Sequence, residues 1–447
     1  MKSTNSQDTI IVKHAVQTVV PKGTAIFGYF EEQAFLAEKL CNAALFRIRQ
    51  RFTMTGKKKL TTNEKQILEE IKLTCSEYHR KMPSRNLSYV FLEKMMRATK
   101  NPDFFSGLPM QTAQQLLKRT VRDFKGWRNA LKSYKKDSSV FTGKPKMPGY
   151  SKKGAGTVVF TNQDCVYKDG FLKFPLTDER LKVYLPEGAV LKEVHVKPFY
   201  GSFKVICIYD IEVSPIDLKG RSSSIDFGME NIASLVINDG TSVIYKGGAL
   251  KAMNQWFNKQ RAHLTSHVKH SAALDALSRN RDNFMRDQLH KISSDIVKRL
   301  VRAGVSVLVL GKNKMQKQNI NIGRKNNQAF VNMPLYILQR MITYKAEETG
   351  ITVICQEESY TSKASFLDDD PIPVYGKEKS PSFSGRRKGR GLYISKNGTV
   401  INADINAAAN ILRKALPNVN IPKKMSLEVV RFYDLNKCTP VKRIAGA

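Results

Sequence analysis

Cysteine, histidine and long apolar runs are scarce in this chain of 447 residues, which has six cysteines and seven histidines. No two cysteines form a Cys-x-x-Cys pair, so neither a disulfide framework nor a zinc ribbon is indicated. The histidines form no His-Glu-x-x-His sequence, and the chain has no phosphate-binding loop and no Gly-x-Ser-x-Gly elbow. No run reaches the ~18 apolar residues that span a membrane, and the first residues lack the apolar segment of a signal peptide. We therefore expect a cytoplasmic protein with reduced thiols and no zinc.

Acidic residues are outnumbered by basic ones. The chain has 74 Lys and Arg against 39 Asp and Glu, which gives a formal net charge of +35. Such a surface attracts polyanions, because neutralising phosphates releases their condensed counterions. The content of 41% hydrophobic and 25% charged residues is typical of a folded soluble protein, which excludes wholesale disorder. Composition alone therefore favours nucleic acid, and not a membrane, as the partner.

The first half of the chain contains a strand pattern, a long helical region and then more strands. Residues 9–20 are rich in β-branched residues and end at Pro21, which indicates a strand. Residues 25–136 carry apolar residues at helical spacing, with basic residues on the other faces. A Gly/Pro/Lys loop and several short strands then extend to about residue 218. Because one strand precedes the helices and the others follow them, we expect the helices to be an insertion into one β-barrel.

The second half begins with two or three strands at 222–247, and a long basic helical stretch follows. The later elements are a buried strand at 305–311, a helix at 334–350, a strand at 351–358 and a helix from 404 to about 416. This is the order of a ribonuclease H-like α/β fold. The predicted domains are therefore a first strand within 1–21, a helical domain at 22–137, a β-barrel at 138–219 and an α/β domain at 220–447.

Three carboxylates lie where the predicted sheet and the final helix would meet. Asp226 sits in an apolar strand, Glu358 ends a later strand, and Asp404 begins the final helix. Strand alternation puts Glu357 and Glu358 on opposite faces, so only one of them can join Asp226. Each candidate also has a simpler interpretation, because an Asp at a strand end can begin a turn and an Asp at a helix start can cap amide groups.

If the three carboxylates converge, they would bind two divalent cations ~4 Å apart. One cation would activate water and the other would stabilise the leaving 3′ oxygen, so no side-chain nucleophile is needed. The small run Ala407–Ala409 favours convergence, because it lets the final helix approach a sheet closely. Mg²⁺ is the expected metal, with Mn²⁺ as an alternative. The acidic run Asp368, Asp369 and Asp370 lies in a Pro-bounded loop and is more simply interpreted as solvated or capping.

Two loops concentrate basic residues among Gly, Pro and Ser. The candidate nucleic-acid-binding residues in them are Lys144, Lys146, Lys152, Lys153, Arg386, Arg387, Lys388 and Arg390. A charge run is usually a solvated face, but an excess that recurs in every segment favours phosphate contact. The aromatic residues Trp127, Tyr150, Phe160 and Tyr393 could stack on bases, although such residues are more often part of a core.

Several segments together resemble one family. IDFGMENIASLV at 225–236 resembles the first RuvC motif of TnpB, the transposon-encoded RNA-guided DNA nucleases related to type V CRISPR effectors. The third motif of that family resembles residues 390–414, and ESYTSKAS at 358–365 is similar to the segment before its zinc-binding insertion. Residues 108–127 and 143–153 are similar to its recognition-helix and wedge-domain signatures. The resemblance covers nearly the whole chain in the right order.

The chain departs from the family pattern in two places. Most relatives place the middle catalytic glutamate at the end of the strand that here finishes with Gly311 and Lys312. A branch with a rearranged centre places it just before Tyr-Thr-Ser-Lys, where this chain has Glu358, with Glu357 in reserve. The two positions terminate neighbouring strands, so either could reach the same metals. Between the second and third motifs, residues 359–397 lack the cysteines of a zinc ribbon, so we expect this insertion to be held by packing or by nucleic acid.

The resemblance implies an RNA-guided DNA endonuclease that uses Asp226, Glu358 and Asp404 as catalytic and metal-binding residues. Its partners would be a transposon-derived noncoding guide RNA and double-stranded target DNA beside a short flanking motif, in the cytoplasm and nucleoid of a prokaryote. The alternatives are a nuclease-inactive RNA-guided repressor, which Gly311 makes conceivable, a small type V CRISPR effector, and a DNA-strand transferase. For the oligomeric state, the sequence allows both a monomer and a dimer.

Overall fold

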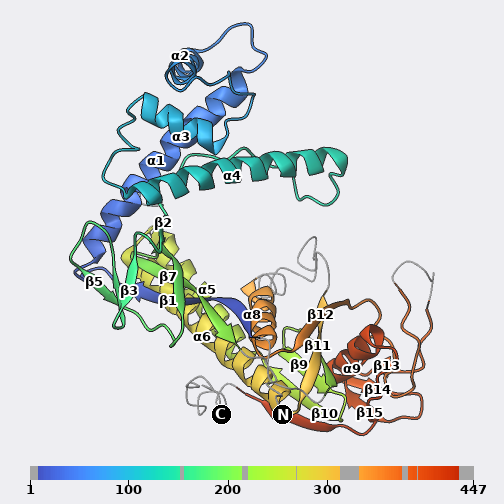
Figure 1. Cartoon of the computed structure of the whole chain (residues 1–447). Helices are drawn as coiled ribbons and strands as arrows, with labels where there is room; N and C mark the ends of the chain where they lie inside the picture. Colours follow the sequence, from blue (N-terminus) through green and yellow to red (C-terminus); the bar gives the residue numbers. More distant parts are fainter. Residues whose placement is uncertain are drawn as a thin grey trace, which may run out of the picture. The chain divides into compact units, whose positions relative to one another are not determined.

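The computed structural model describes residues 9–151, 156–213, 220–267, 269–312, 332–374, 381–389 and 391–431. The chain divides into two compact units, Ile11–Glu212 and Val213–Ala447 with Met1–Ile10. Figure 1 labels their helices and strands. Three of the predicted nucleic-acid-binding residues, Lys152, Lys153 and Arg390, lie outside the described residues. Within the described part of the chain, no helix combines the length and apolar composition needed to cross a membrane.

The helices of the first unit occupy the region where the apolar spacing predicts them. They are α1 (Phe27–Met54), α2 (Thr62–Glu77), α3 (Tyr89–Ala98) and α4 (Met110–Lys136). Helix α2 begins with a capping box, in which the Thr61 side chain accepts from the Glu64 amide and the Glu64 side chain accepts from the Thr61 amide. The Ser88 side chain caps α3 in the same way by accepting from the Phe91 amide.

The strands of the first unit form two sheets. One sheet has the order β1-β7-β6-β2, and the other has the order β3-β4-β5. Their bounds are β1 (Ile10–Val20), β2 (Val158–Thr161), β3 (Val166–Lys168), β4 (Phe171–Lys173), β5 (Arg180–Lys182), β6 (Val190–Phe199) and β7 (Ser202–Val213). Strand β1 precedes the four helices in the chain and pairs with β7, which follows them. The helical segment is therefore an insertion between strands of one sheet.

One core joins the helices and sheets of the first unit. Phe30 of α1 packs against Phe174 and Phe203, with ring centroids 5.1 and 5.9 Å apart, and Phe160 of β2 lies 5.5 Å from Phe174. Three of these rings are fully buried and the fourth nearly so. Such edge-on arrangements are a preferred geometry of aromatic pairs, and they fix the first helix on the strands.

The second unit is built on a six-stranded sheet with the order β12-β11-β8-β9-β10-β16. Its strands are β8 (Arg221–Asp226), β9 (Asn231–Ile237), β10 (Thr241–Lys246), β11 (Val305–Lys312), β12 (Thr352–Glu357) and β16 (Ser426–Val430). Strand β9 is antiparallel to β8 and β10, whereas β8, β11 and β12 run parallel to one another. The mixed α/β fold predicted from the sequence is confirmed. Strand β16, which pairs parallel with β10, was not predicted.

Helices cover both faces of this sheet. The residues of α6 (Ala272–Arg302) and α8 (Leu335–Glu348) share a core with Leu308 and Leu310 of β11. Helix α9 (Ala403–Ala415) packs in a separate core with Val309. Because neighbouring strand residues point to opposite faces, α9 lies on the face opposite α6 and α8. The remaining elements are α5 (Gly248–His267) and a small sheet of β13 (Arg386–Arg387), β14 (Leu392–Ile394) and β15 (Val400–Asn402), which leads into α9.

Candidate active site

The carboxyl ends of β8, β11 and β12 meet at one edge of the six-stranded sheet. In the parallel register Ile225 pairs with Leu310, Gly311 pairs with Gln356, and Lys312 pairs with Glu357. Asp226 is the last residue of β8, and Glu358 directly follows β12. The fold therefore brings the first two carboxylates predicted from the sequence to the same sheet edge.

Helix α9 brings the third carboxylate to this edge. The Asn402 side chain caps the helix by accepting from the amides of Asp404 at 2.9 Å and Ile405 at 3.3 Å. The small run Ala407–Ala409 is buried, and Ser224 of β8 donates its hydroxyl to the carbonyl oxygen of Ala408 at 2.6 Å. Small side chains thus allow the close approach of helix to sheet that the sequence suggested.

The charges of the three carboxylates interact. Burial is the largest cause of a pKa of Asp226 well above its ordinary value, and the negative charges of Glu358 and Asp404 raise it further. The backbone amide of Phe227 and the Arg387 guanidinium oppose this shift. Burial, followed by the charge of Glu357, raises the pKa of Glu358 from 4.5 to about 7. A cation at this edge would relieve the repulsion that Glu358 and Asp404 impose on Asp226.

Glu357 and Glu358 have different environments, as strand alternation predicts. Glu357 accepts from Lys414 Nζ at 2.9 Å and from the Ser359 amide at 2.7 Å. Burial opposes ionisation of Glu357, but these hydrogen bonds outweigh it and lower the pKa of Glu357. The charge of Glu358 raises the pKa of Asp226. Because Glu357 is held by Lys414 and Ser359, these contacts favour Glu358 as the partner of Asp226.

Gly311 makes room for the Glu358 carboxyl group. A Cβ atom added at Gly311 would lie 2.2 Å from Glu358 Oε1 and 2.9 Å from Ile411 Cδ1. Both separations are well below a van der Waals contact, so any side chain at position 311 would displace the carboxyl group. The absence of a side chain at Gly311 on β11 therefore leaves the space that the Glu358 carboxyl group after β12 occupies.

The donor chemistry of this edge suits a hard divalent cation, because Mg²⁺ and Mn²⁺ prefer carboxylate oxygens. Within the described part of the chain, no group of three His, Cys, Asp or Glu side chains is already arranged as a metal site. Glu358 and Asp404 nevertheless both raise the pKa of Asp226, and a cation bound beside Asp226 would relieve that repulsion.

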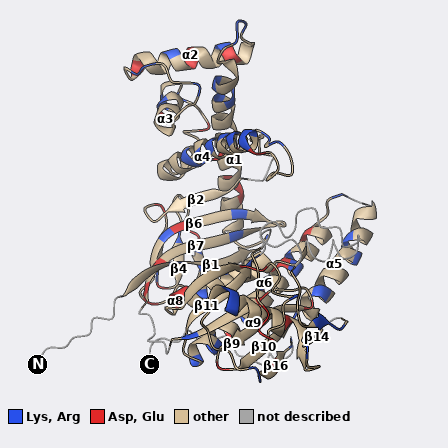
Figure 2. Cartoon of the chain, turned by 90° about the vertical axis from the view of Figure 1, so that its right-hand side faces the viewer, with Lys and Arg blue, Asp and Glu red and all other residues tan. Residues whose placement is uncertain are grey.

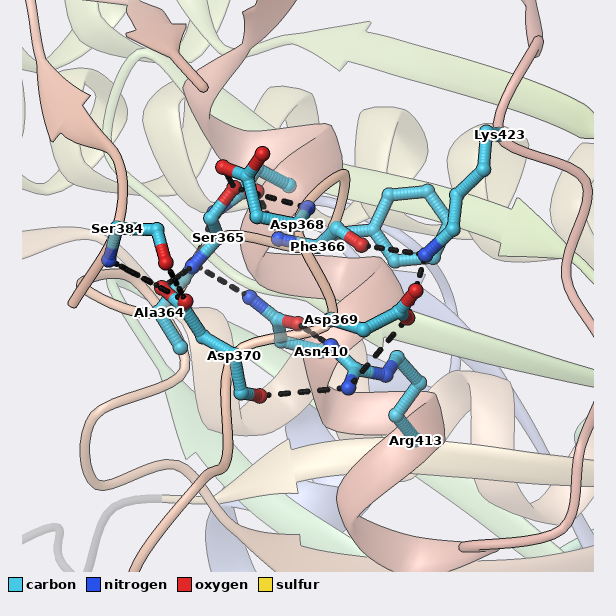
Figure 3. Close-up of polar contacts among 11 residues, drawn as sticks. Ala364, Ser365, Phe366, Asp368, Asp369, Asp370, Ser384, Asn410, Arg413 and Lys423 are labelled. Atoms are coloured by element: carbon cyan, nitrogen blue, oxygen red, sulfur yellow. Dashed lines mark hydrogen bonds and ion pairs between the residues drawn. The ribbon is translucent and has the colours of Figure 1, made fainter. Parts of the chain in front are cut away.

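A network around Asp370 anchors the insertion to α9 (Figure 3). The Asp370 carboxylate is buried and accepts from the Ser365 amide at 2.7 Å and from the Ser384 amide at 3.0 Å. Asn410 donates to the Ala364 carbonyl at 2.7 Å, and Arg413 donates to the Asp370 carbonyl at 3.3 Å. The network ties the segment that follows Glu358 to the helix that carries Asp404.

Sequence reasoning missed the organising role of Asp370. Its neighbour Asp369 is exposed and pairs with Lys423 and Arg413, as a solvated residue would. A signal was present in α9, where Asn406, Asn410 and Arg413 recur at helical spacing among mostly apolar residues. Asn406 accepts from the Phe366 amide at 2.9 Å and donates to the Ala364 carbonyl at 2.9 Å.

The described candidate nucleic-acid-binding residues are exposed. They are Lys144, Lys146, Arg386, Arg387 and Lys388. Figure 2 shows further Lys and Arg residues, in blue, along α4. Of the four aromatic residues, Phe160 and Tyr393 are buried in cores, which confirms the simpler interpretation for them. Tyr150 is exposed beneath the Arg49 guanidinium, and Trp127 is partly buried.

The raised pKa of Glu358 predicts a pH dependence of the metal-free protein. The folded chain holds this proton up to about pH 7, whereas the ordinary pKa of 4.5 describes the unfolded chain. Between these two pH values the folded state binds more protons at Glu358 than the unfolded state does, so the free energy of unfolding falls as the pH rises. The stability that Glu358 contributes is therefore fully present below pH 4.5 and is lost as the pH rises through about 7. When a chelator keeps the protein metal-free, the thermal midpoint should fall more steeply with rising pH for the wild type than for Glu358→Gln. Parallel slopes would contradict the assignment of this pKa.

Two protein families match parts of this chain, and two known proteins are similar to it in sequence. The family OrfB_IS605, described as a probable transposase, matches residues 208–317, and the Cas12f1-like TNB domain matches residues 336–411. The TnpB-like protein ORF457 of Acidianus two-tailed virus is 30% identical over 239 residues, which cover 50% of this chain and 48% of that protein. The endodeoxyribonuclease Cas12f1 of Sulfoacidibacillus thermotolerans is 31% identical over 139 residues, covering 31% of this chain and 28% of that protein. The chain thus spans about half, or less, of the length of these relatives.

Two solved structures are also similar in part. A Cas12f1–sgRNA–target DNA complex has a TM-score of 0.33 and 14% identity, with 91% of this chain and 100% of that chain covered. A CRISPR-Cas12f ternary complex has a TM-score of 0.34 and 14% identity, with 88% of this chain and 82% of that chain covered.

Proposed function

The chain belongs to the TnpB family, which is related to the type V effectors, and we propose that it is an RNA-guided endonuclease that cuts double-stranded DNA. The observation that carries the proposal is the placement of Asp226 at the end of β8, Glu358 after β12 and Asp404 at the start of α9, where the charges of Glu358 and Asp404 both raise the pKa of Asp226. All three carboxylates are partly buried, where like charges are costly, and hydrolytic metal sites are a common reason for a protein to keep such a group.

We infer that the second unit is a ribonuclease H-like (RuvC) nuclease domain. Its support is the strand order, in which the antiparallel strands β8, β9 and β10 lie on one side and the parallel strands β11 and β12 on the other. In the first unit, we propose a wedge domain interrupted by a helical recognition domain. The proposed boundaries are 1–21, 22–137, 138–219 and 220–447, with 359–397 as an insertion without zinc.

Asp226, Glu358 and Asp404 would hold two Mg²⁺ ions, with Glu357 in reserve. When bound, such cations supply activation of water and charge stabilisation at the leaving 3′ oxygen. The protein contributes the carboxylates, the sheet and helix that aim them, and the small residues that bring α9 close. This proposal requires no nucleophilic side chain.

The exposed basic residues support guide RNA and target DNA as partners. Lys144 and Lys146 lie in the first unit, and Arg386, Arg387 and Lys388 lie in the second. In RNA-guided nucleases, base pairing reads the sequence while the protein holds the backbone by charge. We propose that a transposon-derived noncoding RNA fills this role here, next to a short flanking motif in the DNA.

The nuclease-inactive alternative rested on the missing carboxylate at Gly311. That argument loses its force, because the Glu358 carboxyl group occupies the space beside Gly311. Glu358 therefore supplies a carboxylate in place of the missing middle glutamate, and we propose an active enzyme.

RNA that co-purifies with the protein tests the proposal. We expect that protein expressed with its native flanking DNA, and purified at moderate salt, retains a discrete noncoding RNA with one variable end. Sequencing of the bound RNA provides the measurement. Heterogeneous RNA, or none, would contradict RNA guidance and favour a protein-only nuclease or transposase.

A further inference from the structure

A buried amide separates a lysine from one of the three carboxylates. Asn231 is 5% exposed, and its Nδ2 donates to Asp404 Oδ2 at 2.5 Å. Its Oδ1 accepts from Lys246 Nζ at 2.8 Å. The orientation of the amide is fixed by its neighbours, because a flipped amide would direct its NH₂ group at the ammonium and its oxygen at the carboxylate.

The backbone is shaped to bring these side chains together. Asn231 is the first residue of β9, and Lys246 is the last residue of β10. The two are paired at a register shift between Tyr245 and Lys246, which is a local irregularity of the kind that re-aims side chains near functional sites. The next residue, Gly247, donates its amide to the Glu230 carbonyl at 2.8 Å. A Cβ at Gly247 would lie 2.9 Å from the Met229 carbonyl oxygen, so the close approach depends on glycine.

We propose that Asn231, oriented by Lys246, is a positioning residue that fixes the Asp404 carboxylate for cation binding. The inference rests on the proposed function, because it assigns Asp404 a metal. A carboxylate offers about four lone-pair sites, so one hydrogen bond at Oδ2 leaves acceptor capacity for a cation. The second oxygen, Oδ1, lies 3.4 Å from the Arg387 guanidinium.

The positive charge of Lys246 strengthens the hydrogen bond from Asn231 to Asp404. The ammonium of Lys246 polarises the amide, and a polarised amide is a stronger donor to the carboxylate. Groups that orient a metal ligand in this way typically change metal affinity or activity by about 10- to 100-fold when they are removed. A residue that served only the stability of the sheet would leave the metal dependence unchanged.

The test compares Asn231→Ala and Lys246→Met with the wild type in the full-length protein. Lys246 is exposed, so its substitution should leave the fold intact even if Asn231→Ala unfolds. The first readout is the Mg²⁺ concentration that gives half of the Mg²⁺-induced rise in thermal midpoint. We expect this concentration to increase at least about 10-fold in both variants. The second readout is guided cleavage, in which kcat should fall while KM for DNA stays constant.

Asn254→Ala is the matched control. Asn254 is also buried, accepts from Arg281 Nε at 2.9 Å and donates to the Asn332 carbonyl at 3.4 Å. It therefore shares the cation–amide–oxygen arrangement, without a carboxylate of the site. An unchanged Mg²⁺ dependence in Asn231→Ala and Lys246→Met, or an equal change in Asn254→Ala, would overturn the inference.

The two proposals fail separately. A wild type that cuts guided DNA, with an Asn231→Ala variant of unchanged Mg²⁺ dependence, overturns only the positioning role. A wild type that carries no guide RNA overturns the proposed function, yet the Mg²⁺-induced thermal shift still measures whether Asn231 orients Asp404 for a cation.

Discussion

Replacing Asp226 with Asn should reduce DNA cleavage by on the order of 10³-fold, since metal-assisted charge stabilisation is worth several kcal/mol and each 1.4 kcal/mol is about tenfold in rate. Asn keeps the size of the side chain but removes the charge that would hold the cations. Binding of guide and target should persist, because the basic residues are untouched. The measurement is the single-turnover rate on a guide-matched plasmid in Mg²⁺.

The control for this substitution is Asp239→Asn, in the β9–β10 turn, where Asp239 pairs with Arg221 at 2.9 Å. It should cut at the wild-type rate. The Asp226→Asn variant should also respond less to Mg²⁺ in thermal midpoint, because the repulsion that the metal relieves has been reduced. Cleavage at the wild-type rate by Asp226→Asn would show that the sheet edge is not the active site.

Replacing Gly311 with Ala should reduce cleavage by about 10²-fold, the loss expected when a catalytic group is displaced by about 1 Å. The added Cβ would stand 2.2 Å from Glu358 Oε1, so the carboxyl group must move. Gly311 does not have a positive φ, so alanine brings no backbone strain. The measurement is again single-turnover cleavage, together with the thermal midpoint to show that the variant folds.

Gly248→Ala is the matched control, because a Cβ at Gly248 meets nothing within 4 Å. A double variant tests the geometry further. Gly311→Glu with Glu358→Ala moves the carboxylate to the neighbouring strand end and should recover part of the activity that Gly311→Ala loses. Full activity of Gly311→Ala would contradict the role of Glu358.

Local sequence pattern predicted most elements of the second unit and the strand and helix ends on which the candidate carboxylates lie. Buried strands and helical spacing predicted the strand ends at which Asp226 and Glu358 lie, and strand alternation placed Glu357 and Glu358 on opposite faces. The choice of Glu358 came from the family resemblance. The small run in α9 indicated a close helix–sheet contact, which the Ser224–Ala408 hydrogen bond now explains. These features are local, so the sequence carries them directly.

The remaining features depend on contacts between distant residues. Asn231 and Asp404 are 173 positions apart, and no periodicity connects them. Strand β16 is short and mostly exposed, so it lacks the apolar alternation that marks a buried strand. Asp370 resembles its two acidic neighbours in sequence, and only the fold shows that it is the buried one.

The network around Asp370 also bears on the insertion without cysteines. Its carboxylate ties Ser365 to Ser384 across the insertion, and α9 holds the same segment through Asn406 and Asn410. Hydrogen bonds to a buried carboxylate are strong, because the acceptor is charged and water is excluded. Within the described residues, the insertion is therefore held by side-chain contacts to its neighbours.

Guided cleavage by the purified ribonucleoprotein tests the central claim most directly. The wild type, loaded with its co-purified RNA, should cut a plasmid that carries the guide-matched sequence beside a randomised flank, only in Mg²⁺ or Mn²⁺, and Asp404→Asn should not. Cutting that ignores the guide sequence, or that survives Asp404→Asn, would contradict an RNA-guided nuclease centred on Asp226, Glu358 and Asp404.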